Sequence, residues 1–109
     1  MQPEVSIYIT NHNYGKFINK AIDSCLNQTY KKIEILIIDD GSTDNSKKII
    51  NTYTKKYTII RSIFKKKQGL IKSCNTALKQ ARGKFILRLD ADDWLDKNAI
   101  EIMYSKFKK

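Results

Sequence analysis

The sequence predicts an α/β protein of three layers (α/β/α), with helices on both faces of a mostly parallel sheet. Short runs of β-branched and aromatic residues alternate with stretches in which apolar residues recur every three or four positions. One run, residues 33–38, is apolar except for Glu34, which is typical of a strand covered on both faces in a parallel sheet. A chain of 109 residues suffices for one domain with a modest core.

The first half of the chain predicts two strands and two helices. Residues 5–9 are rich in β-branched and aromatic side chains and form the first expected strand. A helix is expected over about 14–27, from the spacing of Ile18, Ala21, Ile22, Cys25 and Leu26. Residues 33–38 form the second strand. Residues 42–46 then offer several caps for a helix that continues through Ile49, Ile50 and Tyr53.

The second half repeats this alternation. Residues 58–64 and 85–89 predict the third and fourth strands. The helix between them is expected to bury Ile71, Cys74, Leu78 and Ala81 and to end with Gly83 as its C-cap. A last helix starts near Asp96, with an apolar stripe of Ile100, Met103, Tyr104 and Phe107. Strands joined by helical crossovers imply a parallel sheet.

Composition excludes several classes of protein. The chain has no run of about 18 apolar residues, which argues against a membrane-spanning helix, and its start lacks the regions of a secretory signal. Cys25 and Cys74 fall within helical stripes and are expected to be buried, reduced packing residues. A disulfide-stapled secreted module is therefore not expected.

The formal net charge of +10 fits an anionic partner: a nucleic acid, a membrane surface or an anionic substrate. The longest cationic run is residues 65–67, and no stacking pattern of aromatic residues accompanies it, so we expect no specific nucleic-acid partner. The last helix carries Lys97, Lys106, Lys108 and Lys109, which would allow peripheral contact with an anionic membrane. The alternative is that a downstream segment covers its apolar stripe.

Polar residues gather at 10–13, 39–42 and 90–93, where three predicted strands end. Ligands of such sheets bind beyond the carboxyl ends of the strands, so five carboxylates are expected at one edge: Asp39, Asp40, Asp90, Asp92 and Asp93. We expect the two acidic strands to be sheet neighbours. Crowded carboxylates favour a hard cation, which predicts a metal–diphosphate platform at 90–93. The alternative is that Asp92 or Asp93 only caps the following helix.

Three segments carry motifs that are specific in combination: VSIYITNHNYGKFINKAIDSCLNQTY, IEILIIDDGSTDNS and QGLIKSCNTALKQARGKFILRLDADDWL. They contain an Asp-Asp-Gly-Ser turn, a Gly-Leu…Asn-x-Ala-Leu helix, and Arg-Gly before a strand that ends in Asp-x-Asp-Asp. From about Val5 to Leu95 the chain resembles the nucleotide-binding half of a family 2 glycosyltransferase. The resemblance implies a Rossmann-like GT-A fold.

The resemblance also implies roles for residues at the first two strand ends. Thr10 and His12 match positions that contact the nucleobase and ribose, although Tyr is more usual where His12 stands. Asp40 matches the carboxylate that binds the base, typically uracil, through its ring N–H. Asp39 is its companion in nucleotide binding, with a structural role as the alternative.

The acidic cluster matches the DXD motif of the family at Asp90-Ala91-Asp92. The resemblance places Asp90 nearer the ribose and makes Asp92, followed by Asp93, the expected ligands of Mn²⁺ or Mg²⁺. Two cationic side chains could face the diphosphate: Arg88 and Lys72.

The reaction expected of the family is inverting transfer from a nucleotide sugar, here a UDP-sugar, to a glycan or lipid-linked acceptor. The acceptor hydroxyl attacks the anomeric carbon, a carboxylate takes its proton, and the divalent ion stabilises the leaving diphosphate. In the family the base lies well beyond the DXD motif, and Glu101 is expected in a helix away from the site. Residues 1–109 are therefore expected to be a donor-binding half from a truncated domain, without a catalytic residue, located in the cytoplasm or at the inner face of the membrane.

Rival functions remain. A phosphatase of the haloacid dehalogenase type would carry its Asp-x-Asp on the first strand, and a receiver domain would carry its phosphorylated Asp after the third strand, where 65–67 are lysines. Both patterns disagree with the sequence. A non-catalytic nucleotide-binding module and a basic nucleic-acid-binding α/β module remain as alternatives.

Overall fold

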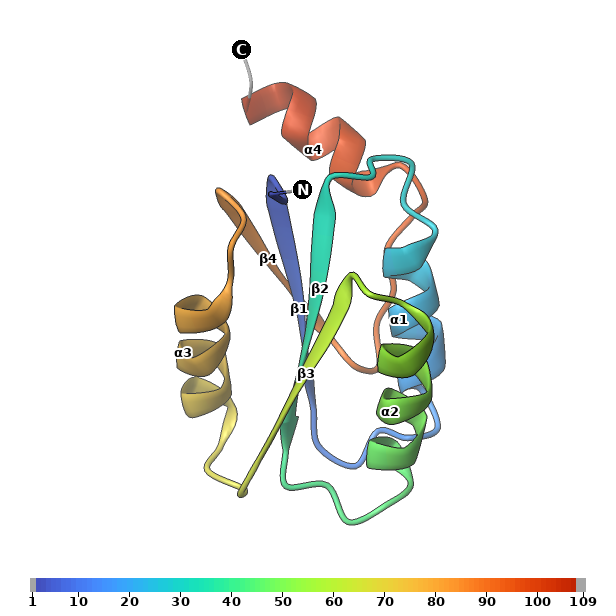
Figure 1. Ribbon diagram of the computed structural model, residues 1–109, viewed down its shortest axis with the longest axis vertical. Coiled ribbons are helices and arrows are strands. Elements are labelled where there is room, and N and C mark those ends of the chain that lie inside the picture. Colours follow the sequence, from blue (N-terminus) through green and yellow to red (C-terminus); the bar gives the residue numbers. More distant parts are fainter. Residues whose placement is uncertain (1, 108–109) are drawn as a thin grey trace.

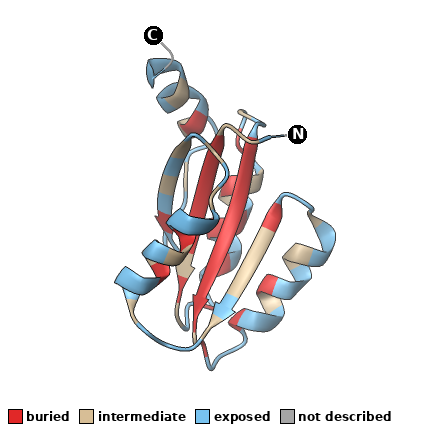
Figure 2. Cartoon of the chain, turned by 60° about the vertical axis from the view of Figure 1, so that its left-hand side comes forward, coloured by how far each residue is buried: buried red, intermediate tan, exposed pale blue. Residues whose placement is uncertain are grey.

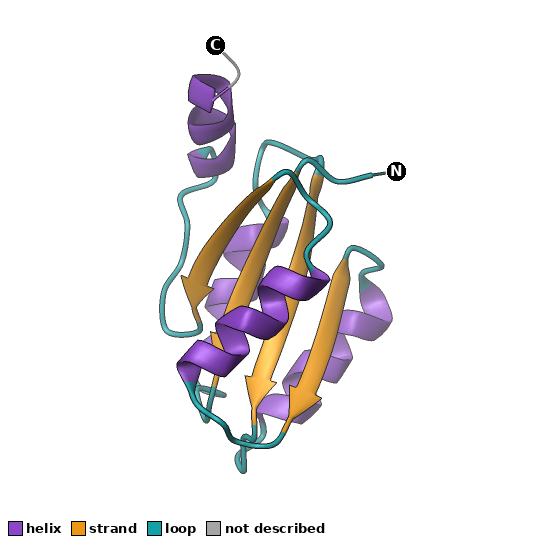
Figure 3. Ribbon diagram, turned by 90° about the vertical axis from the view of Figure 1, so that its left-hand side faces the viewer, coloured by secondary structure: helices purple, strands orange, loops and turns teal. Residues whose placement is uncertain are grey.

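The chain folds around a four-stranded parallel sheet, as a computed structural model that describes residues 2–107 shows (Figure 1). Along the chain the elements are β1 (Val5–Asn11), α1 (Ile18–Leu26), β2 (Ile33–Asp40), α2 (Ser46–Lys56), β3 (Ile60–Lys65), α3 (Leu70–Gln80), β4 (Phe85–Asp90) and α4 (Ala99–Phe107). Helices α1 and α2 cover one face of the sheet and α3 covers the other (Figures 1 and 3). The predicted three-layer α/β/α fold is confirmed.

The strand order is β3-β2-β1-β4, so β1 lies between the two strands that end in acidic residues. In the register of the sheet Thr10 lies beside Ile38 on one side and Asp90 on the other. The expectation that the two acidic strands are neighbours is therefore wrong. After β3 the chain crosses to the far side of β1, and a reversal of strand order at this point leaves room for a ligand.

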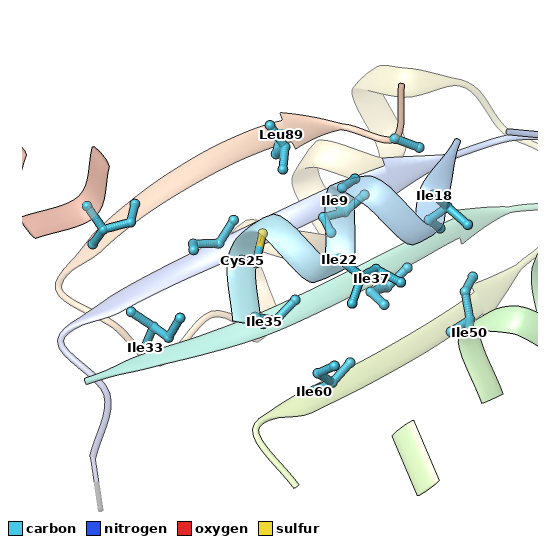
Figure 4. Packing of buried hydrophobic residues seen from close by; sticks show 14 of the residues in the cluster. Ile9, Ile18, Ile22, Cys25, Ile33, Ile35, Ile37, Ile50, Ile60 and Leu89 are labelled. Carbon is cyan, nitrogen blue, oxygen red and sulfur yellow. The ribbon is translucent and has the colours of Figure 1, made fainter. Parts of the chain in front are cut away.

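The main core fills the space between the sheet and α1 and α2, and most of it is isoleucine (Figure 4). The central strands β1 and β2 are buried along almost their whole length, whereas β3 and β4 are more exposed (Figure 2). Helix α1 buries the predicted stripe of Ile18, Ala21, Ile22 and Cys25. It begins at Ile18 rather than Tyr14, because the intervening residues form a turn in which Tyr14 O accepts a hydrogen bond from Phe17 N at 2.9 Å.

Helix α3 buries a different face from the one its apolar residues predict. Ile71 and Leu78 are 78% and 53% exposed, whereas Ser73 and Ala77 are buried. Ala77 belongs to a second small core with the large side chains of the facing sheet: Tyr8, Leu36 and Ile38. Because these side chains fill the space under the helix, small residues face the sheet and the larger apolar ones point to solvent.

Gly83 is not the C-cap of α3, which is an expectation that the structure corrects. The helix ends at Gln80, and its C-cap is Ala81, which has extended backbone. Gly83 instead lies against β1, where an added Cβ would be 2.7 Å from Ser6 N and 2.8 Å from the carbonyl carbon of Val5. A glycine is required here because the loop before β4 approaches the backbone of β1 too closely for any side chain.

Helix α4 begins at Ala99, three residues after the expected start, and packs at the amino-terminal end of the sheet (Figure 1). Ile100 is buried, and the ring of Phe85 stacks on that of Phe107 with centroids 5.0 Å apart. Of its predicted basic residues, Lys108 and Lys109 lie outside the described residues. Between residues 2 and 107 no helix is long and apolar enough to cross a membrane.

The two cysteines are free thiols, as predicted. Cys25 is fully buried in the main core, and burial raises its pKa to about 12. Cys74 is half-buried on α3, with its Sγ 3.9 Å from Arg88 Nη1. The expectation of a buried packing residue therefore holds for Cys25 and in part for Cys74.

Candidate functional site

The carboxyl ends of the strands lie at the lower edge of the sheet in Figure 1. A pocket of about 370 Å³ lies at these strand ends. Residues from β1, β2, β4, α3 and the loops after β1 and β4 line it, among them Thr10, His12, Asp40, Ser73, Asp90 and Asp92. Successive side chains of a strand point to opposite faces, which places Thr10, Asp40 and Asp90 on the face covered by α3. Carboxylates from two separate segments therefore share one pocket, as predicted.

Asp40 is buried at the end of β2 and holds the loop between β3 and α3. Its Oδ1 accepts hydrogen bonds from Lys65 Nζ and Gln68 N, both at 2.8 Å, and its Oδ2 accepts one from Gly69 N at 3.0 Å. Burial by itself would raise the pKa of Asp40, but the bonds from Lys65, Gln68 and Gly69 outweigh it and lower the pKa. Asp40 is thus an ionised hydrogen-bond acceptor.

The segment after β1 is tied to the end of β2. His12 Nδ1 lies 2.6 Å from the main-chain oxygen of Asp40, and because a carbonyl can only accept, this nitrogen carries the proton. Asn13 has a positive φ of 60°, and its Oδ1 accepts a hydrogen bond from Thr43 N at 2.7 Å. These bonds hold His12 at the rim of the pocket, whereas the pairing of β1 with β2 and β4 fixes Thr10.

Asp39 is fully buried, and strand alternation turns it away from Asp40. Its Oδ1 accepts hydrogen bonds from Asn11 Nδ2 at 2.8 Å and Ser42 Oγ at 2.6 Å, and its Oδ2 accepts one from Ser42 N at 3.0 Å. Asp39 does not line the pocket. Its assignment to nucleotide binding stays a prediction, and its geometry suits a structural role that joins β1 to the turn after β2.

The DXD cluster is an exposed turn at the end of β4. Asp90 Oδ1 lies 3.5 Å from Arg88 Nε, so Arg88 pairs with the cluster, and Lys72 does not line the pocket. Asp92 lines the pocket, and its side chain accepts no hydrogen bond from any residue between 2 and 107. Asp93 Oδ1 accepts a hydrogen bond from Trp94 N at 2.9 Å.

The donor set at this turn limits how a cation could be held. Within the described part of the chain, no three Asp, Glu, His or Cys side chains lie close enough together to hold a metal ion on their own. Mg²⁺ in nucleotide sites is usually held by one or two carboxylates together with phosphate oxygens and water. The turn therefore fits a cation that a diphosphate helps to bind.

A sequence model of the family described as "Glycosyl transferase family 2" matches residues 6–109. The chain belongs to this family. It is 39% identical to the chondroitin synthase of Escherichia coli over 107 residues, which are 98% of this chain and 16% of that protein. The chain thus spans less than a fifth of the length of this relative.

Two proteins with solved structures share the fold. Residues 1–349 of S. aureus TarS, solved in complex with UDP, match with a TM-score of 0.88 and 28% identity, covering 96% of this chain and 32% of that one. The same protein was also solved in complex with UDP-GlcNAc. A mannosyltransferase from Pyrobaculum calidifontis, PcManGT, solved with GDP-Man and Mn²⁺, matches with a TM-score of 0.78 and 23% identity, covering 86% of this chain and 29% of that one.

Two residues at or beside this pocket, Lys65 and Ser73, were not predicted from the sequence. In the sequence Lys65 is part of the longest cationic run, and in the structure its side chain is 13% exposed and pairs with Asp40. The signal that could have found it is its position at the end of β3, directly beside Asp40 in the register of the sheet. Ser73 is not predicted because it lies off the apolar stripe from which the sequence predicts the buried face of α3.

Proposed function

We propose that this chain is the donor-binding part of an inverting, metal-dependent glycosyltransferase that takes a UDP-sugar, for transfer to a glycan or lipid-linked acceptor. One observation carries the proposal: in a chain of this family, Asp40 and Asp92 come from separate strand ends and line one pocket. The likeness to TarS, which was solved with UDP and UDP-GlcNAc, supports the choice of nucleotide.

Asp40 is the expected hydrogen-bond partner of the nucleobase. Its Oδ2 accepts one hydrogen bond from the described residues, that of Gly69 N, and a carboxylate oxygen has room for a second. A ring N–H of uracil supplies a donor of the right kind, because the lowered pKa keeps the carboxylate ionised and purely accepting. His12 and Thr10 would flank the base and ribose, and Asp90 would lie nearer the ribose.

Asp92 and Asp93 are the expected ligands of Mn²⁺ or Mg²⁺. Asp92 is an exposed carboxylate at the rim of the pocket, without a hydrogen-bond donor among the described residues, and it can therefore turn toward a cation. A cation bound there would act as a Lewis acid toward the leaving diphosphate. The net charge of +10 favours the approach of such an anionic donor.

We assign no catalytic base to the described residues. Glu101 shares a shallow pocket with Glu4 and Lys32, which lie before β1 and β2 at the opposite end of the sheet. The proposal therefore predicts donor binding by this chain and little transfer by these residues alone. It places the protein in the cytoplasm or at the inner face of the membrane, in polysaccharide synthesis.

Calorimetric titration of UDP and UDP-GlcNAc with and without Mn²⁺ tests the proposal. We expect UDP to bind more tightly with Mn²⁺, Asp92→Asn to lose most of this metal dependence, and Asp40→Asn to weaken binding with or without the metal. Asp96→Asn is the matched control, because Asp96 is exposed and does not line the pocket. No measurable UDP binding by the wild type, or an equal loss in Asp96→Asn, would contradict the proposal. RNA binding of similar strength that weakens steeply with salt would favour the nucleic-acid alternative.

A further inference from the structure

Ser73 is buried in the wall of the pocket, and within the described part of the chain its hydroxyl makes no hydrogen bond that stabilises the fold. The residue lies one turn into α3 and is 1% exposed, and it lines the same pocket as Asp40. Its Oγ has no hydrogen-bond partner among the described residues. A buried hydroxyl without a partner is costly, and such a group in a protein calls for an explanation.

Packing does not explain the hydroxyl. The buried face of α3 consists of Ser73 and Ala77, two small residues one turn apart, which allow the helix to lie close to Tyr8 and Leu36. An alanine at position 73 would fill this role equally well and would leave no polar group unsatisfied. The hydroxyl therefore points to a partner outside the chain.

Main-chain hydrogen bonds connect Ser73 to Asp40 through one residue, Gly69. Gly69 N donates to Asp40 Oδ2 at 3.0 Å, and Gly69 O accepts from Ser73 N at 3.2 Å. The φ of 100° at Gly69 allows the chain to turn between these two bonds. Two other side chains of the pocket wall carry a hydroxyl: Thr10, which lies on β1 beside Asp90, and Tyr14, which lies in the turn before α1. Through the two bonds of Gly69 the helix that carries the Ser73 hydroxyl is connected to Asp40, the carboxylate assigned to the nucleobase.

We propose that Ser73 is a specificity-determining residue that donates its Oγ–H to a carbonyl oxygen of uracil beside the ring N–H that Asp40 accepts. The inference rests on the proposed function. In uracil the ring N–H is flanked by two carbonyl groups, so a carboxylate that reads the N–H needs a donor next to it. The amides of Gln68 and Gly69 already donate to Asp40, and the hydroxyl of Ser73 is still unused.

This arrangement selects among bases by their hydrogen-bond pattern. Cytosine and adenine have no ring N–H at the corresponding edge, and they would leave Asp40 and Ser73 without matching partners. Such a mismatch is penalised strongly because the protein groups are buried. Guanine shares the ring N–H and one carbonyl but is larger, so GDP is the informative competitor.

The test combines a protein change with a change in the ligand. Calorimetry measures the affinity of the full chain, in the presence of Mn²⁺, for UDP, 2-thio-UDP, 4-thio-UDP, CDP and GDP. The proteins are the wild type, Ser73→Ala and Thr76→Ala. Thr76 is the matched control, because its hydroxyl on the same helix donates to Lys72 O at 3.0 Å and does not line the pocket. Thermal denaturation of each variant checks that it folds.

We expect Ser73→Ala to bind UDP about tenfold more weakly than the wild type, and Thr76→Ala to bind it like the wild type. Sulfur accepts hydrogen bonds poorly, so the wild type should bind one of the two thio-analogues about tenfold more weakly than UDP, and Ser73→Ala should not distinguish that analogue from UDP.

Any one of three results would overturn the inference. Ser73→Ala could bind UDP with an affinity within about twofold of that of the wild type, or it could keep the preference of the wild type for UDP over both thio-analogues. The third such result is a wild type that binds GDP or CDP more tightly than UDP. If the wild type binds none of the nucleotides with Mn²⁺, the proposed function fails and this inference fails with it. If the wild type binds UDP and Ser73→Ala binds it with the same affinity, only the role of Ser73 is refuted and the proposed function stands.

Discussion

Glu34 is a buried carboxylate that clamps three parts of the fold together, and Glu34→Gln should destabilise the protein strongly. The residue lies in β2 and is 6% exposed. Its Oε2 accepts hydrogen bonds from Ser6 Oγ in β1 and from Arg82 N before β4, both at 2.6 Å. Its Oε1 accepts one from Arg61 Nη2 in β3 at 2.9 Å.

The expected loss follows from this donor set. A glutamine has the same shape but presents an NH₂ group in place of one acceptor, so whichever way the amide turns, it faces a donor of Arg61 or Arg82. Losing a hydrogen bond to a charged group costs about 1.5–3 kcal/mol, and leaving a buried donor unpaired costs about 1–3 kcal/mol. The hydroxyl of Ser6 can turn to accept from the amide, which offsets part of the loss. We expect the free energy of unfolding to fall by about 3 kcal/mol, out of a total of about 5–15 kcal/mol.

Urea and thermal denaturation followed by circular dichroism measure this change at pH 7. For a domain of this size the melting temperature should fall by about 12 °C. Glu101→Gln makes the same chemical change at an exposed position and should alter the free energy of unfolding by less than about 0.5 kcal/mol. A loss below about 0.5 kcal/mol in Glu34→Gln, or an equal loss in both variants, would refute the reasoning.

The pH dependence gives an independent check. Burial would raise the pKa of Glu34, but the hydrogen bonds from Ser6 and Arg82 and the pairing with Arg61 outweigh it and lower the pKa in the folded state. A group with a lowered folded pKa contributes stability above its unfolded pKa of about 4.3, and this contribution is lost as the pH falls through the folded value. The difference in stability between the wild type and Glu34→Gln should therefore shrink in acid.

Two further predictions concern packing. Gly83→Ala should lower the free energy of unfolding by about 1–3 kcal/mol, as measured by urea denaturation. The added Cβ would meet Ser6 N at 2.7 Å and the carbonyl carbon of Val5 at 2.8 Å, so backbone atoms must move to relieve the contact. An unchanged denaturation midpoint would contradict this prediction, because it would show that the loop relaxes freely. The folded protein should react with a thiol reagent at Cys74 well before Cys25. Cys25 is fully buried with its pKa raised to about 12, whereas Cys74 is partly exposed. Mass spectrometry of the first labelled peptide measures the order, and equal rates of labelling would contradict the described core.

Much of the site was predictable from residue order. Strand ends carry the polar residues, and Asp40 and Asp92 line one pocket as expected. The separate environments of Asp39 and Asp40 also follow from sequence, because neighbouring residues of a strand face opposite sides of the sheet. The side chain of Asp39 contacts Asn11 and Ser42 in the interior, and that of Asp40 lines the pocket.

The sequence by itself determined the alternation of strands and helices, because hydrophobic period and β-branched content are local properties of the chain. It also determined which residues stand at the strand ends. The strand order, the buried face of α3 and the pairing of Lys65 with Asp40 were decided by the tertiary structure. Each depends on which surfaces meet: Ser73 and Ala77 face the sheet because Tyr8, Leu36 and Ile38 leave space there for small side chains, and no periodicity within α3 contains that information.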